Sequence, residues 1–372
     1  MAKDVFRYML PHDPPADKQL IFFPYWRFKG MLFACNPKGI NQKFIDVSHQ
    51  AVESNYFPHS VGLRSQALKL KFVTPETKGK FLKPNRSLDT VIHTFEHRFS
   101  KTLTKPVLQQ SHIGETVSLI YSPVYLKDKV YDAVINEPVS STLPDDFNID
   151  QFPGGPTGWQ IQFISTLCPK CGWDLDGQRD TLVLLCKNCT TAWYSAGKSL
   201  KQLKFGLYPS EGDIGIYLPF WRVRAQITGI QLQTYADLIK VANLPRVAQD
   251  GWQDLGFRFW VPAFKVRPRV FLRLSTNMTL SQPTDNLQGE LPGISHQPIT
   301  MPVTEAVECL KMTLFSFIKP RSTLADIVPQ IEIHAKSFVL VYIPFKEGHH
   351  EFIHPELQFA INKNTLKLSK NL

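Results

Sequence analysis

The stretch 168-CPKCGWDLDGQRDTLVLLCKNC-189 carries the most specific pattern in this chain. It holds two C-x-x-C pairs, Cys168 with Cys171 and Cys186 with Cys189, separated by residues 172–185. That spacing lets two tight loops offer four thiolates to one tetrahedral ion, and zinc is the ion most often bound by such a set. Because four protein sulfurs fill the tetrahedron, the sequence predicts a structural zinc site rather than a catalytic one.

Other uses of the four thiols remain open. Iron bound as in rubredoxin fits the first pair, which is followed by Gly172, but the second pair is followed by Thr190. A redox dithiol is a further alternative. Disulfide bonds require an oxidising compartment, and residues 1–7 lack the apolar core of a secretory signal. We therefore expect reduced cysteines in a cytoplasmic protein.

The residues around the two pairs favour short hairpins. Asp176-Gly177 is a turn dipeptide, 181-TLVLL-185 has the composition of a strand, and Trp193-Tyr194 lies beyond the second pair. Over residues 158–196 the segment resembles zinc ribbons, in which each cysteine pair lies at the tip of a hairpin. The resemblance implies bound zinc and a ribbon fold. It implies no particular function, since zinc ribbons occur in many unrelated proteins.

An internal repeat is the second pattern in the chain. The stretch 20-LIFFPYWRFKG-30 returns as 215-GIYLPFWRVRA-225, at a spacing of about 195 residues. Further matches follow in the same order: 61-VGLR-64 with 255-LGFR-258, the helical pattern of Val91, Ile92, Phe95 and Phe99 with that of Ala306, Val307, Leu310 and Leu314, and 119-LIYSPVY-125 with 340-LVYIPF-345.

The repeat predicts an α+β, β-rich fold with two similar β-rich halves. Each half is expected to carry one main helix, and the two halves flank an inserted zinc ribbon. Segments rich in proline and glycine set the boundaries between these parts. The expected domains are residues 1–150 for the first half, 157–198 for the zinc ribbon and 199–372 for the second half.

Each repeated strand carries a proline beside aromatic residues. Proline lacks the N–H donor of a sheet ladder, so edge positions are expected for Pro24, Pro123, Pro219 and Pro344. The pairs Tyr25-Trp26 and Phe220-Trp221 are expected to pack in the core of their half. The alternative is a groove shared by the halves, in which Arg27 and Arg222 hold an acidic ligand.

Two histidine patterns and two further cysteines are candidate metal or catalytic sites. Residues 93-HTFEH-97 spell H-x-x-E-H, which resembles the signature of inverzincin metalloproteases. No third ligand is identifiable, so a solvated helix face is the expected role. A second group is expected in an exposed hairpin loop, with a second metal site as the alternative: Glu347, His349, His350, Glu351 and His354. Cys309 is expected in the core, and Cys35 lies at the end of an apolar strand.

Composition limits the functions that need to be considered. The chain has 372 residues, 43% of them hydrophobic, and a formal net charge of +10. No run of eighteen apolar residues occurs, so no transmembrane segment is expected. The phosphate-binding pattern G-x-x-x-x-G-K-[ST] is also absent. The positive charge favours an acidic partner, although the Lys and Arg residues are scattered along the chain.

These observations predict a non-enzymatic zinc-binding interaction protein. It would act as a subunit, scaffold or assembly factor that presents the duplicated β-rich surfaces to a protein partner or larger complex. The first alternative is a nucleic-acid-binding zinc-ribbon protein in which Trp173, Trp193 or Tyr194 stack on bases. The second alternative is a metallohydrolase using the H-x-x-E-H motif of His93, Glu96 and His97. The sequence sets no oligomeric state.

Overall fold

The structure, a computed structural model, divides into two compact units. The first contains Met1–Gly30, Ile45–Leu103 and Glu115–Gln162, and the second contains Met31–Phe44, Thr104–Gly114 and Phe163–Leu372. The described residues are 4–11, 18–63, 68–74, 76–87, 90–95, 103, 105–154, 164–178, 180–197, 199–209, 212–246, 249–283, 286–293, 295–357 and 359–369.

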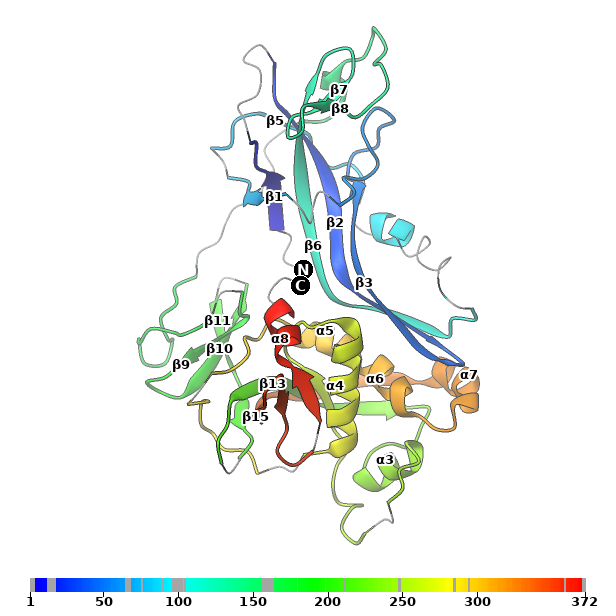
Figure 1. Cartoon of the computed structure of the whole chain (residues 1–372), viewed down its shortest axis with the longest axis vertical. Helices are drawn as coiled ribbons and strands as arrows, with labels where there is room; N and C mark the ends of the chain where they lie inside the picture. Colours follow the sequence, from blue (N-terminus) through cyan, green and yellow to red (C-terminus); the bar gives the residue numbers. More distant parts are fainter. Residues whose placement is uncertain are drawn as a thin grey trace. The chain divides into compact units, whose positions relative to one another are not determined.

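An eight-stranded sheet contains the first repeated strand (Figure 1). The strand order is β3-β2-β6-β1-β4, with β5 beside β2, β7 beside β6 and β8 beside β7. The long strands extend into residues 31–44 and 104–114, which belong to the second unit. The strands are β1 (Asp4–Tyr8), β2 (Ile21–Asn36), β3 (Gly39–Gln50), β4 (Leu70–Phe72), β5 (Lys80–Phe81), β6 (Gln109–Leu126), β7 (Val130–Asp132) and β8 (Glu137–Pro138).

Strand β2 supplies much of the core of the first unit. Almost every residue of this strand is buried, as expected for a strand covered on both faces. Phe23 stacks on Phe57 with ring centroids 4.1 Å apart, and Tyr25 lies 5.2 Å from Phe23. Both Tyr25 and Trp26 are buried, so the packing role expected for this aromatic pair is confirmed.

The second unit contains a six-stranded sheet and several helices. The strand order is β14-β13-β15-β16-β17, with β12 parallel to β15. The strands are β12 (Phe205–Leu207), β13 (Ile216–Thr228), β14 (Phe259–Pro262), β15 (Glu332–Glu347), β16 (Glu351–Ile353) and β17 (Ala360–Asn362). The helices are α3 (Tyr235–Val241), α4 (Pro268–Ser281), α5 (Val303–Glu308), α6 (Leu310–Phe317), α7 (Leu324–Ile327) and α8 (Lys363–Ser369).

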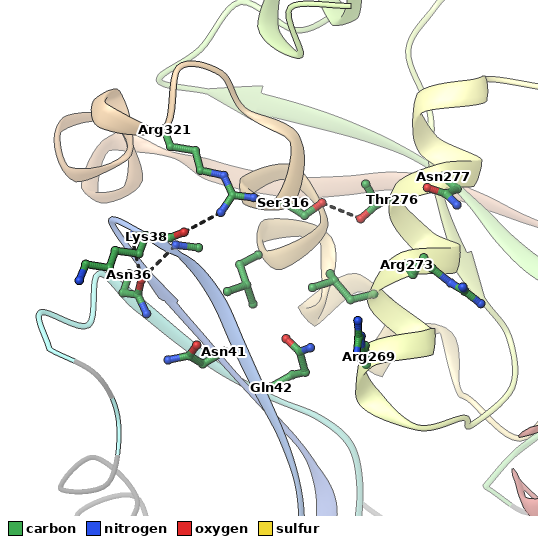
Figure 2. Close-up of a pocket in the computed structure, with 13 residues that line it drawn as sticks. Asn36, Lys38, Asn41, Gln42, Arg269, Arg273, Thr276, Asn277, Ser316 and Arg321 are labelled. Atoms are coloured by element: carbon green, nitrogen blue, oxygen red, sulfur yellow. Dashed lines mark hydrogen bonds between the residues drawn. The ribbon is translucent and has the colours of Figure 1, made fainter. Parts of the chain in front are cut away.

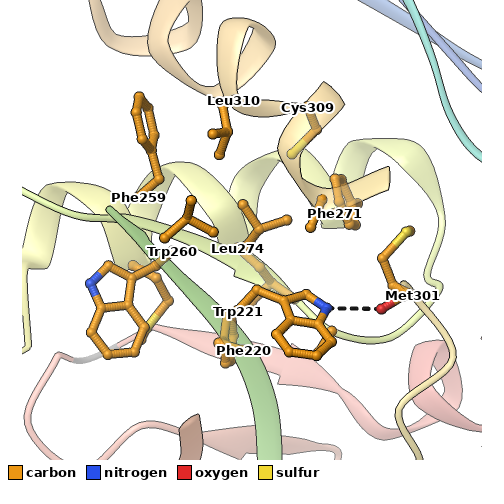
Figure 3. Packing of buried hydrophobic residues seen from close by; sticks show 14 of the residues in the cluster. Phe220, Trp221, Phe259, Trp260, Phe271, Leu274, Met301, Cys309 and Leu310 are labelled. Carbon is orange, nitrogen blue, oxygen red and sulfur yellow. Dashed lines mark hydrogen bonds between the residues drawn. The ribbon is translucent and has the colours of Figure 1, made fainter. Parts of the chain in front are cut away.

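Helix α4 covers the repeated strand of the second unit. Its buried residues Phe271, Leu274 and Met278 recur at helical spacing, and Pro268 starts the helix where no N–H donor is needed. Figure 3 shows Phe271 and Leu274 packed beside Phe220 and Trp221. The second aromatic pair is therefore also buried, as expected.

The expectation of one main helix is wrong for the second half, where six α-helices are described. The helix predicted over Ala306–Leu314 exists as α5 and α6, which meet at Cys309. Helix α4 was not predicted, because the polar residues Ser275 and Thr279 interrupt the apolar pattern of its buried face. The described part of the first half has a helical turn over residues 90–95, whereas Phe99 lies outside the described residues.

The prolines of the repeated strands lie in inner strands, so the expectation of sheet edges is wrong. Pro219 lies opposite Tyr342 in the β13–β15 ladder. Two residues earlier, the N–H of Tyr217 donates to the carbonyl of Ser295, on the side of β13 away from β15. Since alternate residues point the same way, the nitrogen of Pro219 also faces away from β15. Proline therefore costs this ladder no hydrogen bond.

Hydrogen bonds around Trp26 join three segments of the first unit. The N–H of Ala51 donates to the carbonyl of Pro24 at 2.9 Å. The carbonyl of Ala51 accepts from the N–H groups of Asn85 and Arg86, both at 3.0 Å. The indole Nε1 of Trp26 donates to the carbonyl of Arg86 at 3.0 Å. The residues that follow β5 are thereby fixed to β2 and to the end of β3.

The second unit contains the same set of bonds. The N–H of Ala263 donates to the carbonyl of Pro219 at 2.9 Å. The carbonyl of Ala263 accepts from Thr300 and Met301, both at 3.0 Å. The indole Nε1 of Trp221 donates to the carbonyl of Met301 at 2.8 Å (Figure 3). Segment 295–301 is thereby fixed to β13 and to the residue after β14.

Three short strands, β9 (Val183–Cys186), β10 (Thr191–Ala196) and β11 (Ser199–Leu203), follow the first cysteine pair. They form a separate sheet in the order β11-β10-β9. One face packs Trp193 against the cysteines, and the other adds Val183, Leu185 and Ala192 to the core of the second unit. The ribbon sheet therefore shares a hydrophobic core with the second half.

Candidate metal centre

Each cysteine pair lies in a tight turn of the ribbon. In the first turn, the N–H of Gly172 donates to the carbonyl of Cys168 at 2.8 Å, and the N–H of Cys168 donates to the carbonyl of Trp173 at 2.8 Å. In the second turn, Cys186 ends β9 and pairs with Thr191 at the start of β10. The two turns bring all four thiols to one end of the ribbon.

The sulfur positions suit a tetrahedral ion. The four Sγ atoms all lie within 4.8 Å of one another. Across the two pairs, Cys168 Sγ is 3.6 Å from Cys189 Sγ, and Cys171 Sγ is 3.5 Å from Cys186 Sγ. Zinc with Zn–S bonds of about 2.3 Å requires sulfurs about 3.8 Å apart. The four cysteines are therefore compatible with one metal ion such as zinc.

The crowded sulfurs have thiol pKa values shifted in opposite directions. Burial works to raise the pKa of Cys168, but backbone N–H groups of Cys171 and Lys170 outweigh it and lower that pKa to about 6. The Thr191 hydroxyl works to lower the pKa of Cys189, but burial and the neighbouring sulfurs raise it to about 12. Four adjacent thiolates repel one another, so full ionisation of the cluster requires a cation between them.

Thr191 supports the cluster from the side of the sheet. Its Oγ1 lies 3.1 Å from Cys189 Sγ and 3.8 Å from Cys168 Sγ. It also accepts a hydrogen bond of 2.9 Å from the indole Nε1 of Trp193. Such outer contacts fix the orientation of metal ligands. Thr191 was not singled out from the sequence, although its place two residues after Cys189 was a usable signal.

The residue after each cysteine pair has the same backbone conformation, although only the first is glycine. Gly172 has φ +73°, and Thr190, at the matching place in the second turn, has φ +53°. Both residues therefore adopt the left-handed conformation that returns the chain towards the strand. Glycine adopts it freely, whereas a residue with a Cβ is strained there.

The ribbon is hydrogen-bonded to segment 295–301 of the second half. The N–H of Leu182 donates to the carbonyl of Ile299 at 2.7 Å, and Gln178 Nε2 donates to the carbonyl of His296 at 3.3 Å. The same segment holds Met301, whose carbonyl accepts the indole bond of Trp221. The ribbon is therefore bonded to the segment that also bonds to Ala263 and Trp221.

The described residues of the two histidine patterns do not gather into a second cluster. His93 is exposed, and Glu96 and His97 lie outside the described residues. His349 and His350 are exposed and 2.9 Å apart, whereas His354 is buried among rings, contrary to its expected exposure. Burial lowers the pKa of His354 to about 4. Within the part of the chain that the structure describes, only the four cysteines gather as a metal-ligand set.

The remaining sequence candidates are engaged inside the protein. Arg27 forms a two-bond ion pair with Asp46, at 2.7 and 2.6 Å. Arg222 lies over the ring of Trp260, 5.9 Å from its centre. Cys309 is buried, as expected, and burial raises its pKa to about 12. These contacts do not support a groove in which the two arginines hold an acidic ligand.

The aromatic residues weighed for base stacking differ in exposure. Trp193 is buried against the cysteines, and Tyr194 is partly buried. Trp173, on the first turn, is 61% exposed, and its neighbour Leu167 is 51% exposed. Trp173 is therefore the most exposed of the three rings.

Comparisons with known proteins do not identify a family: no family model, no curated protein and no solved structure matches this chain. Among the described residues, no helix is both long enough and apolar enough to cross a membrane.

Proposed function

We propose that this protein is a non-enzymatic zinc-binding interaction protein that acts as a subunit, scaffold or assembly factor. The observation that supports it is the closed set of four sulfurs within 4.8 Å of one another. Zinc held by four thiolates has no open position for a substrate, so it stabilises the fold instead. The proposed ligands are Cys168, Cys171, Cys186 and Cys189.

The zinc would stabilise more than the ribbon. A module of this size buries too little apolar surface to fold alone, and tetrathiolate zinc contributes about 10 to 16 kcal/mol to such modules. The bonds from Leu182 and Gln178 to segment 295–301 extend this constraint to the second half. The shared packing of Val183, Leu185 and Ala192 supports the same coupling.

The proposed organisation has three parts, residues 1–150, 157–198 and 199–372, with the two halves related by duplication. Its support is the matched set of hydrogen bonds in the two units. In each set, a proline carbonyl accepts from the N–H of an alanine, and the carbonyl of that alanine accepts from the N–H groups of two consecutive residues. The tryptophan indole then donates to the carbonyl of the second of these two residues. Unrelated segments would rarely repeat all three features in the same chain order.

A protein partner would bind at the first turn of the ribbon. Trp173 and Leu167 are large exposed apolar residues that flank the first cysteine pair, and Leu167 forms a bridge with Asp174, the residue after Trp173. Aromatic residues are enriched at protein interfaces. The cysteine cluster holds the turn rigid, so binding a partner would cost little conformational entropy. Nucleic acid is the rival partner, favoured by the net charge of +10 and by the exposed ring of Trp173.

The metal content of the purified full chain tests the zinc site. One zinc per chain is expected in the wild-type protein, and none in a Cys186→Ser variant. Cys35→Ala is the matched control, because it removes a buried thiol outside the ribbon and should keep the metal. Absence of metal from wild-type protein purified without chelators would disprove the proposal, and iron instead of zinc would correct the identity of the ion.

Purification from the native cell tests the partner. A protein that copurifies in stoichiometric amount should be lost with Trp173→Ala and kept with Leu255→Ala, which truncates a similarly exposed residue elsewhere (52% exposed). The interaction should persist in high salt, since apolar contacts are not screened. Copurifying nucleic acid that is released as salt rises would favour the rival partner.

A further inference from the structure

A pocket with a strongly positive lining lies within the second unit (Figure 2). It has a volume of about 530 Å³ and is formed by the turn between β2 and β3, helix α4, the end of α6 and Arg321. Pockets of this size accommodate small organic ligands. The segments that form it, residues 36–42 and 269–321, are far apart in the chain, so no local pattern predicts the pocket.

Four cations line the pocket, and no carboxylate does. They are Lys38, Arg269, Arg273 and Arg321, and all four are exposed. Within the residues that the structure describes, none of the four forms an ion pair with Asp or Glu. Arg273 Nη2 also donates to the carbonyl of Ala360 at 3.1 Å. Cations without a carboxylate beside them give the lining a positive potential, which attracts anions.

Helix α4 places two of these cations along one face. Arg269, Arg273 and Asn277 follow one another at i, i+4 and i+8, so they share that face. Arg269 lies in the first turn, where the helix dipole is positive and where acidic residues are favoured, yet this turn contains none. A local preference broken in this way is typical of a binding site. The positive end of the helix adds to the attraction for an anion.

The opposite wall of the pocket is a rigid turn. The side chain of Asn36 accepts from the N–H groups of Lys38 and Gly39, at 2.9 and 3.0 Å. Arg321 Nη1 donates to the carbonyl of Lys38 at 2.7 Å, and a Cβ on Gly39 would lie 2.5 Å from that nitrogen. A side chain at position 39 would therefore displace the Arg321 guanidinium from its present position. The turn is held in place before any ligand binds.

Neutral donors complete the lining. Figure 2 shows Gln42 and Asn41 on the strand that faces Arg269 across the pocket. Among the described residues, the side chains of these three make no hydrogen bond, so their donors are available to a ligand. Arginine and amide N–H groups arranged around one space match the oxygens of a phosphate group.

We propose that this pocket binds a ligand carrying two or more phosphate groups. Four cations exceed the charge of one phosphate, which favours a multiply charged ligand. Arg269 and Lys38 would contact the phosphates from opposite walls, and Arg321 would hold the turn. The phosphates would come either from a small phosphorylated molecule or from a nucleic-acid strand, which share this chemistry.

Calorimetric titration of the zinc-loaded full chain with inorganic tripolyphosphate tests the proposal. The test variant is Lys38→Gln with Arg269→Gln, because among the described residues these two side chains form no hydrogen bond or ion pair. The control is Lys201→Gln with Lys367→Gln, which removes the same charge from exposed positions elsewhere. Because a charged hydrogen bond is worth about tenfold in affinity, the test variant should bind at least about tenfold more weakly and the control within about twofold.

A fluorescent single-stranded oligonucleotide identifies the source of the phosphates. The pocket binds a nucleic-acid strand if tripolyphosphate displaces the oligonucleotide and the test variant binds the oligonucleotide more weakly. The pocket binds a small phosphorylated ligand if the test variant loses affinity for tripolyphosphate alone. The proposal is overturned if neither probe binds at up to about 1 mM, the weak end of specific binding. It is also overturned if the test and control variants lose affinity equally.

Discussion

The two units share one set of hydrogen bonds but support it in different ways. In the first unit, the N–H of Lys83 donates to the carbonyl of Pro153 at 2.7 Å, and Leu82 forms a bridge with Gly154. Residues 153 and 154 therefore support the segment that leads to Arg86. In the second unit, the ribbon supports segment 295–301 through Leu182 and its shared core.

The same set of hydrogen bonds therefore forms in a unit with the four-cysteine cluster and in a unit without it. The bonds of Trp26 and Trp221 are nearly equal in length, at 3.0 and 2.8 Å, although only the second unit contains the cysteines. The proposed zinc is therefore a local addition to one unit. Only that unit should respond when the metal is removed.

Loss of the metal gives the largest expected effect. In Cys186→Ser, the ribbon should unfold, because zinc contributes about 10 to 16 kcal/mol to modules of this kind. Hydrogen exchange followed by mass spectrometry should show full loss of protection over β9 to β11 and partial loss over segment 295–301. Segment 80–86 of the first unit should keep its wild-type exchange.

The control for this experiment is again Cys35→Ala, which should leave the exchange of the ribbon unchanged. Equal loss of protection in segments 80–86 and 295–301 would contradict the comparison, because it would mean that the metal supports both units. An unchanged segment 295–301 beside an unfolded ribbon would show that the two are not coupled.

Acid should destabilise the second unit through His354. Burial lowers the pKa of this residue from the ordinary histidine value of 6.5 to about 4. Between these pH values the unfolded chain binds more protons than the folded one, so stability falls as pH falls through this window. The shift corresponds to about 3 kcal/mol at full extent. The urea midpoint of the second unit, measured from pH 7 to 4, should fall accordingly.

His354→Asn isolates this contribution. In the wild type, Nδ1 of His354 accepts from the N–H groups of Glu356 and Leu357, at 3.2 and 3.0 Å. The Oδ1 of asparagine can take the same place without titrating. The variant should be less stable at pH 7 but should lose less stability on acidification. Parallel pH profiles for the two proteins would rule out His354 as the source.

Removal of each indole donor tests the equivalence of the units. Trp26→Phe and Trp221→Phe leave the carbonyls of Arg86 and Met301 without their donors. Each change should cost about 1 to 3 kcal/mol, from the lost bond and the smaller ring. Exchange-derived stabilities should fall in the altered unit alone, and by similar amounts. A large loss in one unit and none in the other would count against a duplicated framework.

The sequence predicted those parts of the protein that depend on local spacing. Two C-x-x-C pairs bring their thiols together because each turn is short and only residues 172–185 separate the pairs. Buried aromatic pairs followed from their place in apolar strands. The repeated Pro-x-Trp pattern pointed to segments that later proved to share their hydrogen bonds.

What the sequence did not reveal depends on contacts between distant segments. The edge position expected for Pro219 was wrong because a proline nitrogen can face away from one ladder inside a sheet. Helix α4 was missed because its buried face alternates with Ser275 and Thr279, which are buried through hydrogen bonds to the carbonyl of Trp260. The basic pocket joins residues near positions 38 and 269, and no local pattern connects them.

The smallest expected effect distinguishes the two turns of the ribbon. The left-handed conformation costs a residue with a Cβ about 1 to 2 kcal/mol. Glycine avoids this cost but loses more conformational entropy on folding, so the net gain in stability is smaller. Thr190→Gly should therefore strengthen metal retention by about 1 kcal/mol or less. Because Thr190 is exposed, no packing is lost. The measurement is the chelator concentration that removes half of the metal.

Gly172→Ala is the mirror-image change in the first turn. A Cβ at Gly172 would meet no atom within 4 Å, so its effect comes from the backbone alone. It should weaken metal retention by about 1 kcal/mol, because alanine must adopt φ +73°. If Thr190→Gly weakened retention as well, the threonine side chain would have to stabilise the second turn. The opposite signs of the two changes are therefore what the shared left-handed backbone requires.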